Sequence, residues 1–299
     1  MPLISVLTPT YNRARTLPRL AESLSAQGFR DFEWLVVDDG STDDTTRVLE
    51  DLARSAAFPI RVIRTPNGGK HRALNRGIPE ARGDWVYIVD SDDYLPVNAL
   101  ERIASLVSEA ASQPGCCGLI GLRGDTKGGV ISSGLPAEPR FQTIIELSFR
   151  RHVTGDKALI FRKDSLLRFP FPEFDGEKFL TESVVWYRMG KEGLSLLVVD
   201  EILYECEYQD SGLSDKSLEL RVRNPKGNLL YYSEQLDLDL PFLQRFRPAI
   251  NYMRFSLIGR TRLRAALDGL SHGRILALLS LPVAAMMAAR DSAILRSRE

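Results

Sequence analysis

Four short apolar runs, each followed by a helical pattern, constrain the fold of the first 125 residues of this chain. The runs are rich in β-branched and aromatic side chains, which is typical of buried strands. They cover residues 4–8, 33–37, 60–64 and 85–89. The stretches that carry apolar side chains at helical spacing cover residues 16–27, 42–57, 69–81 and 97–112. Strands that alternate with helices in this way predict an α/β fold with a parallel, doubly wound sheet.

A polar loop follows each of the four predicted strands. The loops are Thr8–Arg13, Asp38–Ser41, Pro66–His71 and Asp90–Asp93. The carboxyl ends of parallel strands meet at one edge of a sheet, so we expect these loops to build a single site. Such a site would combine carboxylates for a metal with cationic side chains for phosphates, and Tyr11 to line a nucleobase.

Three carboxylates lie within four positions at the end of the fourth strand: Asp90, Asp92 and Asp93. Carboxylates this close repel one another unless positive charge lies between them. A hard divalent cation with oxygen ligands supplies that charge in many proteins, and Mg²⁺ is often shared with substrate phosphates. The alternative is an acidic, solvated turn.

Two common nucleotide signatures are missing. Gly-x-Gly-x-x-Gly does not follow the first strand, which argues against a dinucleotide cofactor. Gly-x-x-x-x-Gly-Lys-Ser/Thr is also absent, which argues against an ATPase phosphate loop. The basic stretches lack interleaved aromatic residues, so we expect no nucleic acid partner.

The rest of the chain is less regular. We expect a strand and loops in residues 115–135, a helix at 141–149 and a strand at 158–161. A helix is expected at 181–190 and one or two strands at 196–208, with mostly helices from residue 218 onward. Tyr208–Ser214 reads as a loop that closes over the site.

Charge is unevenly distributed, although the whole chain has a formal net charge of zero. From Pro241 onward there are ten arginines, no lysine and three acidic residues, a net charge of about +7. Ile275–Ala289 carries no charge and is shorter than the roughly 20 residues that span a bilayer. It predicts either a buried helix hairpin or a helix at a membrane surface. The arginines either contact an anionic partner or form solvated helix faces.

The three cysteines do not suggest disulfides or a zinc site, and they fit a reducing compartment. The N-terminus has no charged segment followed by an apolar one, so we expect no signal peptide.

Three segments resemble family 2 glycosyltransferases of the GT-A fold, and the resemblance covers about residues 3–210. The segments are "ISVLTPTYNRARTLPRLAESLSAQGFRDFEWLVVDDGSTDDT", "GGKHRALNRGIPEARGDWVYIVDSDDYLP" and "GEKFLTESVVWYRMG". The resemblance implies metal-dependent transfer of a sugar from a nucleotide diphosphate donor, with inversion at the anomeric carbon.

The resemblance also implies roles for individual residues. The metal, Mn²⁺ or Mg²⁺, is expected on Asp92 and Asp93. Asp39, or its neighbour Asp38, is expected to contact the nucleoside base. The full set of expected nucleotide-sugar contacts is Pro9, Tyr11, Arg13, Asp39, Lys70, His71, Asp90 and Asp92.

The third segment departs from the family pattern. Many members have an aspartate as catalytic base where this chain has Ser183, and a serine cannot replace a carboxylate base. Glu182 remains and is our candidate base, with helix capping as the alternative role. Glu177 is a weaker candidate, and Asp175 is weaker still.

We therefore expect a catalytic domain over residues 1–214, with a nucleotide-sugar half at 1–114 and an acceptor half at 115–214. A helical, Arg-rich extension follows at 215–299. By analogy with the family, the acceptor is a glycan or lipid-linked sugar of bacterial-type surface polysaccharide synthesis. The expected location is the cytoplasm, with peripheral contact to the inner face of the membrane. The alternatives are a nucleotide-sugar-binding protein without transferase activity and a nucleotidyltransferase.

Overall fold

The computed structural model describes residues 1–206 and 217–296, so the predicted loop at Tyr208–Ser214 lies outside the described residues. The described residues divide into two compact units. The sheet unit contains Met1–Phe171 and the residues from Arg188 to Cys206. The helical unit contains Pro172–Tyr187 and the residues from Ser217 to Arg296.

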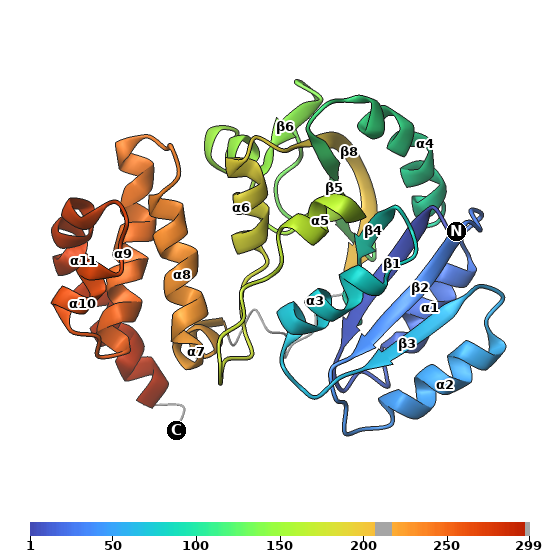
Figure 1. Cartoon of the computed structure of the whole chain (residues 1–299), viewed down its shortest axis with the longest axis horizontal. Helices are drawn as coiled ribbons and strands as arrows, with labels where there is room; N and C mark the ends of the chain where they lie inside the picture. The colour runs from blue at the N-terminus through green and yellow to red at the C-terminus, as the bar shows by residue number, and fades with distance from the viewer. Residues whose placement is uncertain (207–216, 297–299) are drawn as a thin grey trace. The chain divides into compact units, whose positions relative to one another are not determined.

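The sheet unit is built on one eight-stranded sheet with the strand order β3-β2-β1-β4-β7-β5-β8-β6 (Figure 1). The strands are β1 Ile4–Thr10, β2 Phe32–Asp38, β3 Ile60–Arg64, β4 Trp85–Ile88, β5 Cys116–Asp125, β6 Phe141–Thr143, β7 Ala158–Arg162 and β8 Ser195–Cys206. The pairs β3-β2, β2-β1 and β1-β4 are parallel, as predicted. Strand β7 runs antiparallel to β4 and β5, and β6 runs antiparallel to β8. The α/β fold class is confirmed, with a sheet of mixed direction.

Helices connect the parallel strands, as the alternating pattern predicted. The helices of the sheet unit are α1 Leu17–Ser25, α2 Thr45–Ser55, α3 Lys70–Glu80, α4 Ala99–Ser112, η1 Glu146–Arg150 and α5 Lys163–Arg168. Helix α6, Ser183–Lys191, passes from the helical unit into the sheet unit.

The prediction of a helix over residues 141–149 is wrong in its first part. Residues 141–143 form β6, and the short helix η1 begins only at Glu146. Phe141 and Gln142 pair with Leu197 and Leu196 of β8, which supplies backbone partners to the β6 segment. That partner lies far along the chain, so local apolar spacing gives no sign of it.

The core of the sheet unit lies on both faces of β1 and β2. Every residue of these two strands is buried. The largest fully buried side chains in the sheet are Trp34, Tyr87, Tyr204 and Phe32. A strand covered on both faces needs a continuous apolar run, which is why the first strands were recognisable from sequence.

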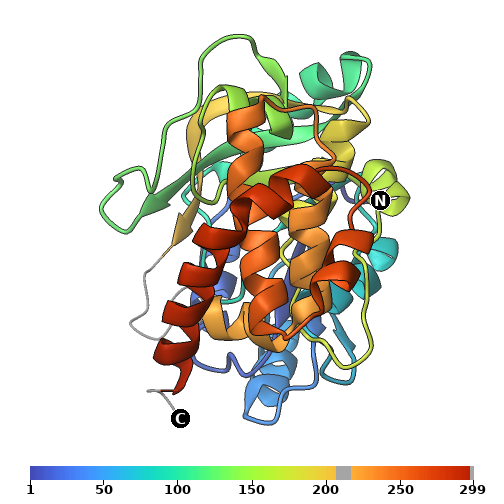
Figure 2. The ribbon, with the colours of Figure 1, turned by 90° about the vertical axis from the view of Figure 1, so that its left-hand side faces the viewer.

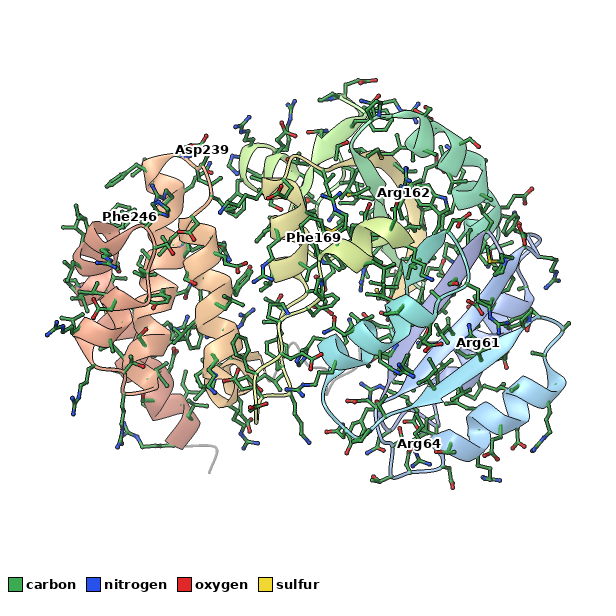
Figure 3. The ribbon with its side chains drawn as sticks, viewed as in Figure 1. Arg61, Arg64, Arg162, Phe169, Asp239 and Phe246 are labelled. Carbon is green, nitrogen blue, oxygen red and sulfur yellow. The ribbon has the colours of Figure 1, made fainter. Side chains whose placement is uncertain are left out.

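A buried carboxylate joins the amino-terminal ends of the strands. Glu33 is 2% exposed and accepts hydrogen bonds from the Ser5 hydroxyl at 2.7 Å and the Arg82 amide at 2.7 Å. Arg61 of β3, labelled in Figure 3, forms an ion pair with it at 3.1 Å. The Gly83 amide donates to the Ser5 hydroxyl at 2.9 Å, so the chain entering β4 lies directly against β1.

The helical unit has a core of its own. Its helices are α7 Ser217–Arg223, α8 Pro225–Leu236, α9 Phe242–Ile258, α10 Leu263–Asp268 and α11 Arg274–Arg296. Leu236, Met253, Leu276 and Ala277 are among its buried residues. Figure 2 shows α11 lying along α9.

Two segments of the helical unit cap each other. The Glu177 carboxylate accepts hydrogen bonds from the amides of Lys226 and Gly227 at the start of α8, at 2.8 and 2.9 Å. In return, the Asn224 side-chain oxygen accepts a hydrogen bond from the Lys178 amide at 2.7 Å. The two bonds to Glu177 satisfy amides at the start of α8 that have no partner within the helix. All three bonds tie residues 172–187 to the C-terminal helices.

We expect Gly83→Ala to destabilise the sheet unit by about 1–3 kcal/mol, because it overpacks a buried contact. A Cβ at Gly83 would lie 2.6 Å from the Ser5 backbone nitrogen and 2.7 Å from the Ile4 carbonyl carbon. Neither backbone atom can move without shifting β1. Urea unfolding measures the effect, with Gly28→Ala as control, whose Cβ meets nothing closer than 3.6 Å. Equal losses in the two variants would contradict this packing.

Candidate functional site

The candidate site is the edge of the sheet where β1, β2 and β4 end. The loop after β4, residues 90–94, is held there by the start of α1. The Thr16 hydroxyl donates to the Ser91 carbonyl at 2.8 Å, and the Arg19 guanidinium donates to the Asp92 carbonyl. The loop after β4 therefore lies against the polar loops that follow β1 and β3, as the sequence predicted.

Asp90 lies between two cationic side chains. Its carboxylate forms an ion pair with the Lys70 ammonium at 2.5 Å and lies 3.8 Å from the Arg123 guanidinium. Burial acts to raise the pKa of Asp90, but the charges of Lys70 and Arg123 hold it below its ordinary value. Asp90 is therefore ionised at neutral pH, and its pair with Lys70 joins the first residue of α3 to the end of β4.

Asp92 and Asp93 have different surroundings. Asp92 forms an ion pair with Arg13 at 3.2 Å, and about a third of each side chain is exposed. Asp93 is buried, accepts a hydrogen bond from the Tyr204 hydroxyl at 2.9 Å and lies 3.7 Å from Arg123. Burial, reinforced by the charge of Asp90, raises the pKa of Asp93 to about 6.

Arg123 of β5 and Tyr204 of β8 belong to this cluster, and sequence reasoning missed both. The Arg123 guanidinium lies 4.1 Å from the centroid of the Tyr204 ring, a cation–π contact. The Tyr204 hydroxyl also accepts a hydrogen bond from the Asp90 amide at 2.8 Å. An arginine near the end of the apolar, Gly-rich run of β5 was an available signal for Arg123. Tyr204 is one of many apolar residues in its strand and gave no such signal.

Asp39 joins the loop after β2 to the start of α3. Its carboxylate accepts hydrogen bonds from the Gly68 amide at 2.8 Å and the Gly69 amide at 2.7 Å, and also from the Asn67 side chain. The side chain is buried. Asp39 thus fixes the backbone that leads into Lys70.

Asp38, the alternative to Asp39, stabilises its own turn. It is 1% exposed, and its carboxylate accepts a hydrogen bond from the Ser41 amide at 2.9 Å. The guanidinium of Arg64, labelled in Figure 3, lies 3.6 Å from it. The Asp39 carboxylate contacts the loop before α3, whereas Asp38 reaches that loop through its backbone carbonyl, which accepts a hydrogen bond from the Thr65 amide at 2.9 Å.

The loop after β1 presents Tyr11 and Arg13 at the surface. Tyr11 is 44% exposed, whereas Pro9 is buried within β1. Between Tyr11 and Arg13, Asn12 has a φ of 54°, and its side-chain oxygen accepts a hydrogen bond from the Thr42 amide at 2.8 Å. This left-handed residue turns the chain so that its two neighbours flank the loop after β2.

His71 and the predicted acceptor-side residues lie in less open positions. His71 follows Lys70 in the first turn of α3 and is 2% exposed. Glu182 belongs to the helical unit, directly before α6, where its carbonyl accepts a hydrogen bond from the Val185 amide at 3.0 Å. Trp186 is buried, and the Tyr187 ring stacks on Tyr231, so both aromatic rings pack against protein.

Glu177, the weaker candidate for the base, has a structural role. Both carboxylate oxygens accept amide hydrogen bonds from α8, and the side chain is buried.

Over residues 1–206 and 217–296, no group of three or more His, Cys, Asp and Glu side chains is arranged to hold a metal ion.

The sheet order and the acidic loop after β4 define the GT-A class of fold. Comparison with protein families agrees with this assignment: the model of glycosyl transferase family 2 matches residues 5–166. The chain belongs to this family.

A curated relative and two solved structures illustrate the similarity. Over 107 residues the chain is 36% identical to poly(ribitol-phosphate) beta-N-acetylglucosaminyltransferase TarS of Staphylococcus aureus. That match covers 35% of this chain and about a fifth (19%) of TarS. The crystal structure of S. aureus TarS 1–349 in complex with UDP-GlcNAc superposes with a TM-score of 0.61 and 21% identity, covering 98% of this chain and 83% of that one. The mannosyltransferase PcManGT from Pyrobaculum calidifontis, in complex with GDP-Man and Mn²⁺, gives a TM-score of 0.59 and 17% identity, covering 97% and 84%.

We expect Asp93 to make stability depend on pH in the metal-free protein. A folded-state pKa of about 6 stabilises the fold at low pH, and this contribution is lost as the pH rises from about 4 to about 6. In Asp93→Asn this part of the pH dependence should disappear, a change of about 3 kcal/mol across that window. Urea unfolding with a chelator present measures it. Asp44→Asn, whose side chain is 74% exposed, should keep the wild-type profile. An unchanged profile in Asp93→Asn would contradict the raised pKa.

Proposed function

We propose that this protein transfers a sugar from a nucleotide diphosphate donor to a hydroxyl acceptor, with inversion at the anomeric carbon and with the help of a divalent metal. The observation that carries the proposal is the cluster after β4, where Asp90, Asp92 and Asp93 meet Lys70 and Arg13. Family membership and a fold shared with enzymes solved in complex with UDP-GlcNAc and with GDP-Man support it.

The donor set at this loop fits a divalent cation. All three side chains offer carboxylate oxygens, the ligands that Mg²⁺ and Mn²⁺ prefer. Mg²⁺ is often held by only one or two carboxylates, with substrate phosphates completing its shell, so a three-residue cluster is not required. Asp92 is partly exposed at 32%, and burial, reinforced by the charge of Asp90, raises the pKa of Asp93. We assign the metal to Asp92 and Asp93.

The donor contacts follow from where each group lies. Tyr11 is exposed beside the loop after β2, so it can cover a nucleobase. Asp39 holds the glycine loop before α3, and its remaining lone pairs are available to the base. Lys70 and Arg13 already bind carboxylates of the cluster, so a diphosphate would share their charge. Pro9 and His71 are buried, and we propose that they shape the site from beneath.

The transfer itself needs two further things of the chain. The leaving nucleoside diphosphate gains negative charge, which a bound divalent metal would neutralise as a Lewis acid. The acceptor hydroxyl must lose its proton as it attacks, and we propose Glu182 as the base that takes it. Because Glu177 caps α8, it is not available for this role without loss of structure.

The acceptor is proposed to be a glycan or lipid-linked sugar, at the cytoplasmic face of a membrane. This part rests on family analogy. The alternative function is nucleotide-sugar binding without transfer, and it is motivated by Ser183, where many relatives have an aspartate.

Nucleotide binding tests the site directly. We expect one of UDP, GDP and dTDP to bind tightly in the presence of Mn²⁺, because the metal joins the carboxylates to the diphosphate. Asp92→Asn should weaken that binding at least about tenfold, whereas the exposed Asp44→Asn should not. Isothermal titration calorimetry, with and without Mn²⁺, provides the measurement. Metal-independent binding of equal strength in all three proteins would refute the metal assignment.

Replacement of the base separates transfer from binding. We expect Glu182→Gln to lower turnover by about 10²–10⁴-fold while leaving donor affinity unchanged, because only proton removal is lost. The exposed Glu192→Gln is the matched control. Turnover is followed by release of the nucleoside diphosphate with a family-type acceptor, and affinity by calorimetry. Full activity in Glu182→Gln would place the base elsewhere. Donor binding without turnover by the wild type on any acceptor would favour the alternative function.

A further inference from the structure

Helix α11 has an apolar face that no described residue covers. Between Arg274 and Arg290 its exposed positions carry only apolar side chains. Ile275 is 75% exposed, Leu279 58% and Met286 67%, and Leu278 and Val283 are each 43% exposed. At 3.6 residues per turn these positions recur on one side of the helix and form a continuous stripe. We call these five residues the α11 stripe.

The opposite face of α11 is also apolar, because it packs in the core of the helical unit. Leu276, Ala277 and Ala284 are buried in the cluster that α9 shares. An ordinary surface helix has an apolar face toward the core and a polar face toward solvent. This helix lacks the polar face over about four turns, roughly 20 Å, so its stripe matches an apolar environment outside the chain.

Arginines border the stripe at both ends and recur through the helical unit. Arg274 and Arg290 border it on α11 itself, and both are exposed. Arg260, Arg262 and Arg264 add three more exposed guanidinium groups around the start of α10. Among the exposed residues described from 241 to 296, the only carboxylate is Asp268, which lies 3.8 Å from Arg264. The exposed charge of residues 241–296 is therefore strongly positive.

From these features we infer that the helical unit docks on an anionic lipid surface through the α11 stripe. The apolar side chains enter the boundary between headgroups and acyl chains, and the arginines bind lipid phosphates. This pairing of an apolar stripe with a cationic border is complementary to an anionic bilayer. Arginine is well suited to the border because its guanidinium binds phosphate through two parallel hydrogen bonds.

The helix lies on the bilayer in this inference and does not span it. By length and composition α11 is apolar enough to cross a membrane. However, a third (33%) of its most apolar window is buried inside the protein, and the uncharged segment ends at Arg290 after 15 residues. Spanning would expose the α9 contact and the buried ion pair between Arg254 and Asp291 to lipid.

Vesicle binding of the full chain tests the inference. The probes are vesicles of phosphatidylcholine alone and vesicles containing about one third phosphatidylglycerol. We expect the wild type to sediment with the anionic vesicles, less with the neutral ones, and less as salt increases. The double variant Leu279→Glu with Met286→Glu should bind about tenfold more weakly, because two charges enter the stripe. Both side chains are mostly exposed, so the fold should tolerate the change.

Val97→Glu is the matched control, since Val97 is an apolar residue of the sheet unit that is 72% exposed. It should bind anionic vesicles as the wild type does. Equal binding by wild type and double variant would overturn the inference, and so would no binding by the wild type. Sedimentation velocity without lipid provides a second arm: a wild-type dimer that the double variant loses would identify the stripe as a contact between copies and overturn the lipid assignment. Metal-dependent nucleotide binding, measured separately, should be the same in all three proteins, so failure here leaves the proposed function standing.

Discussion

The balance of charge around the loop after β4 is the interaction on which the candidate site depends. Three carboxylates lie within four positions there. Arg13, Lys70 and Arg123, which come from three different parts of the chain, form ion pairs with them. Each cation also has a structural consequence, since the pairs connect the loop after β1, helix α3 and strand β5 to the loop after β4. Asp93 has the least exposed side chain of the three, and burial together with the charge of Asp90 raises its pKa.

Features that follow from local residue patterns could be predicted from the sequence, whereas features that depend on pairing with a distant segment could not. The parallel strands and the helices between them were predictable because each buried strand is a continuous apolar run and each helix has an apolar face. The proximity of Asp90, Asp92 and Lys70 was predictable because strand ends meet at one edge. Strand β6 was not, because its pairing partner lies on β8. Tyr204 was not, because nothing in an apolar strand distinguishes the tyrosine that faces two aspartates.

The described residues group into two units, and the sequence-based boundary at residue 214 remains a prediction. Residues 172–187, including Glu182 and Ser183, group with the C-terminal helices in the structure. The reason is chemical. Glu177 accepts hydrogen bonds from backbone amides close to Asn224, and Asn224 accepts one from a backbone amide next to Glu177. Neither set of bonds can be recognised in a sequence. If Glu182 is the base, then the helical unit supplies a catalytic group as well as the α11 stripe. Acceptor chemistry and surface attachment would then belong to the same unit.

The position of β8 in the sheet has a consequence for how this protein is made. Within the sheet β8 lies between β5 and β6, yet among the described strands it is the last to leave the ribosome. Until it emerges, β6 has no partner and the Arg123 guanidinium lacks the aromatic ring beneath it. Residues 172–187 are also synthesised between β6 and β8, and their capping partners at the start of α8 are synthesised after β8. Chains of this size emerge over many seconds, so the nascent sheet exposes an open edge next to its future site for a substantial time. Chaperones that recognise unpaired strands would find their target there.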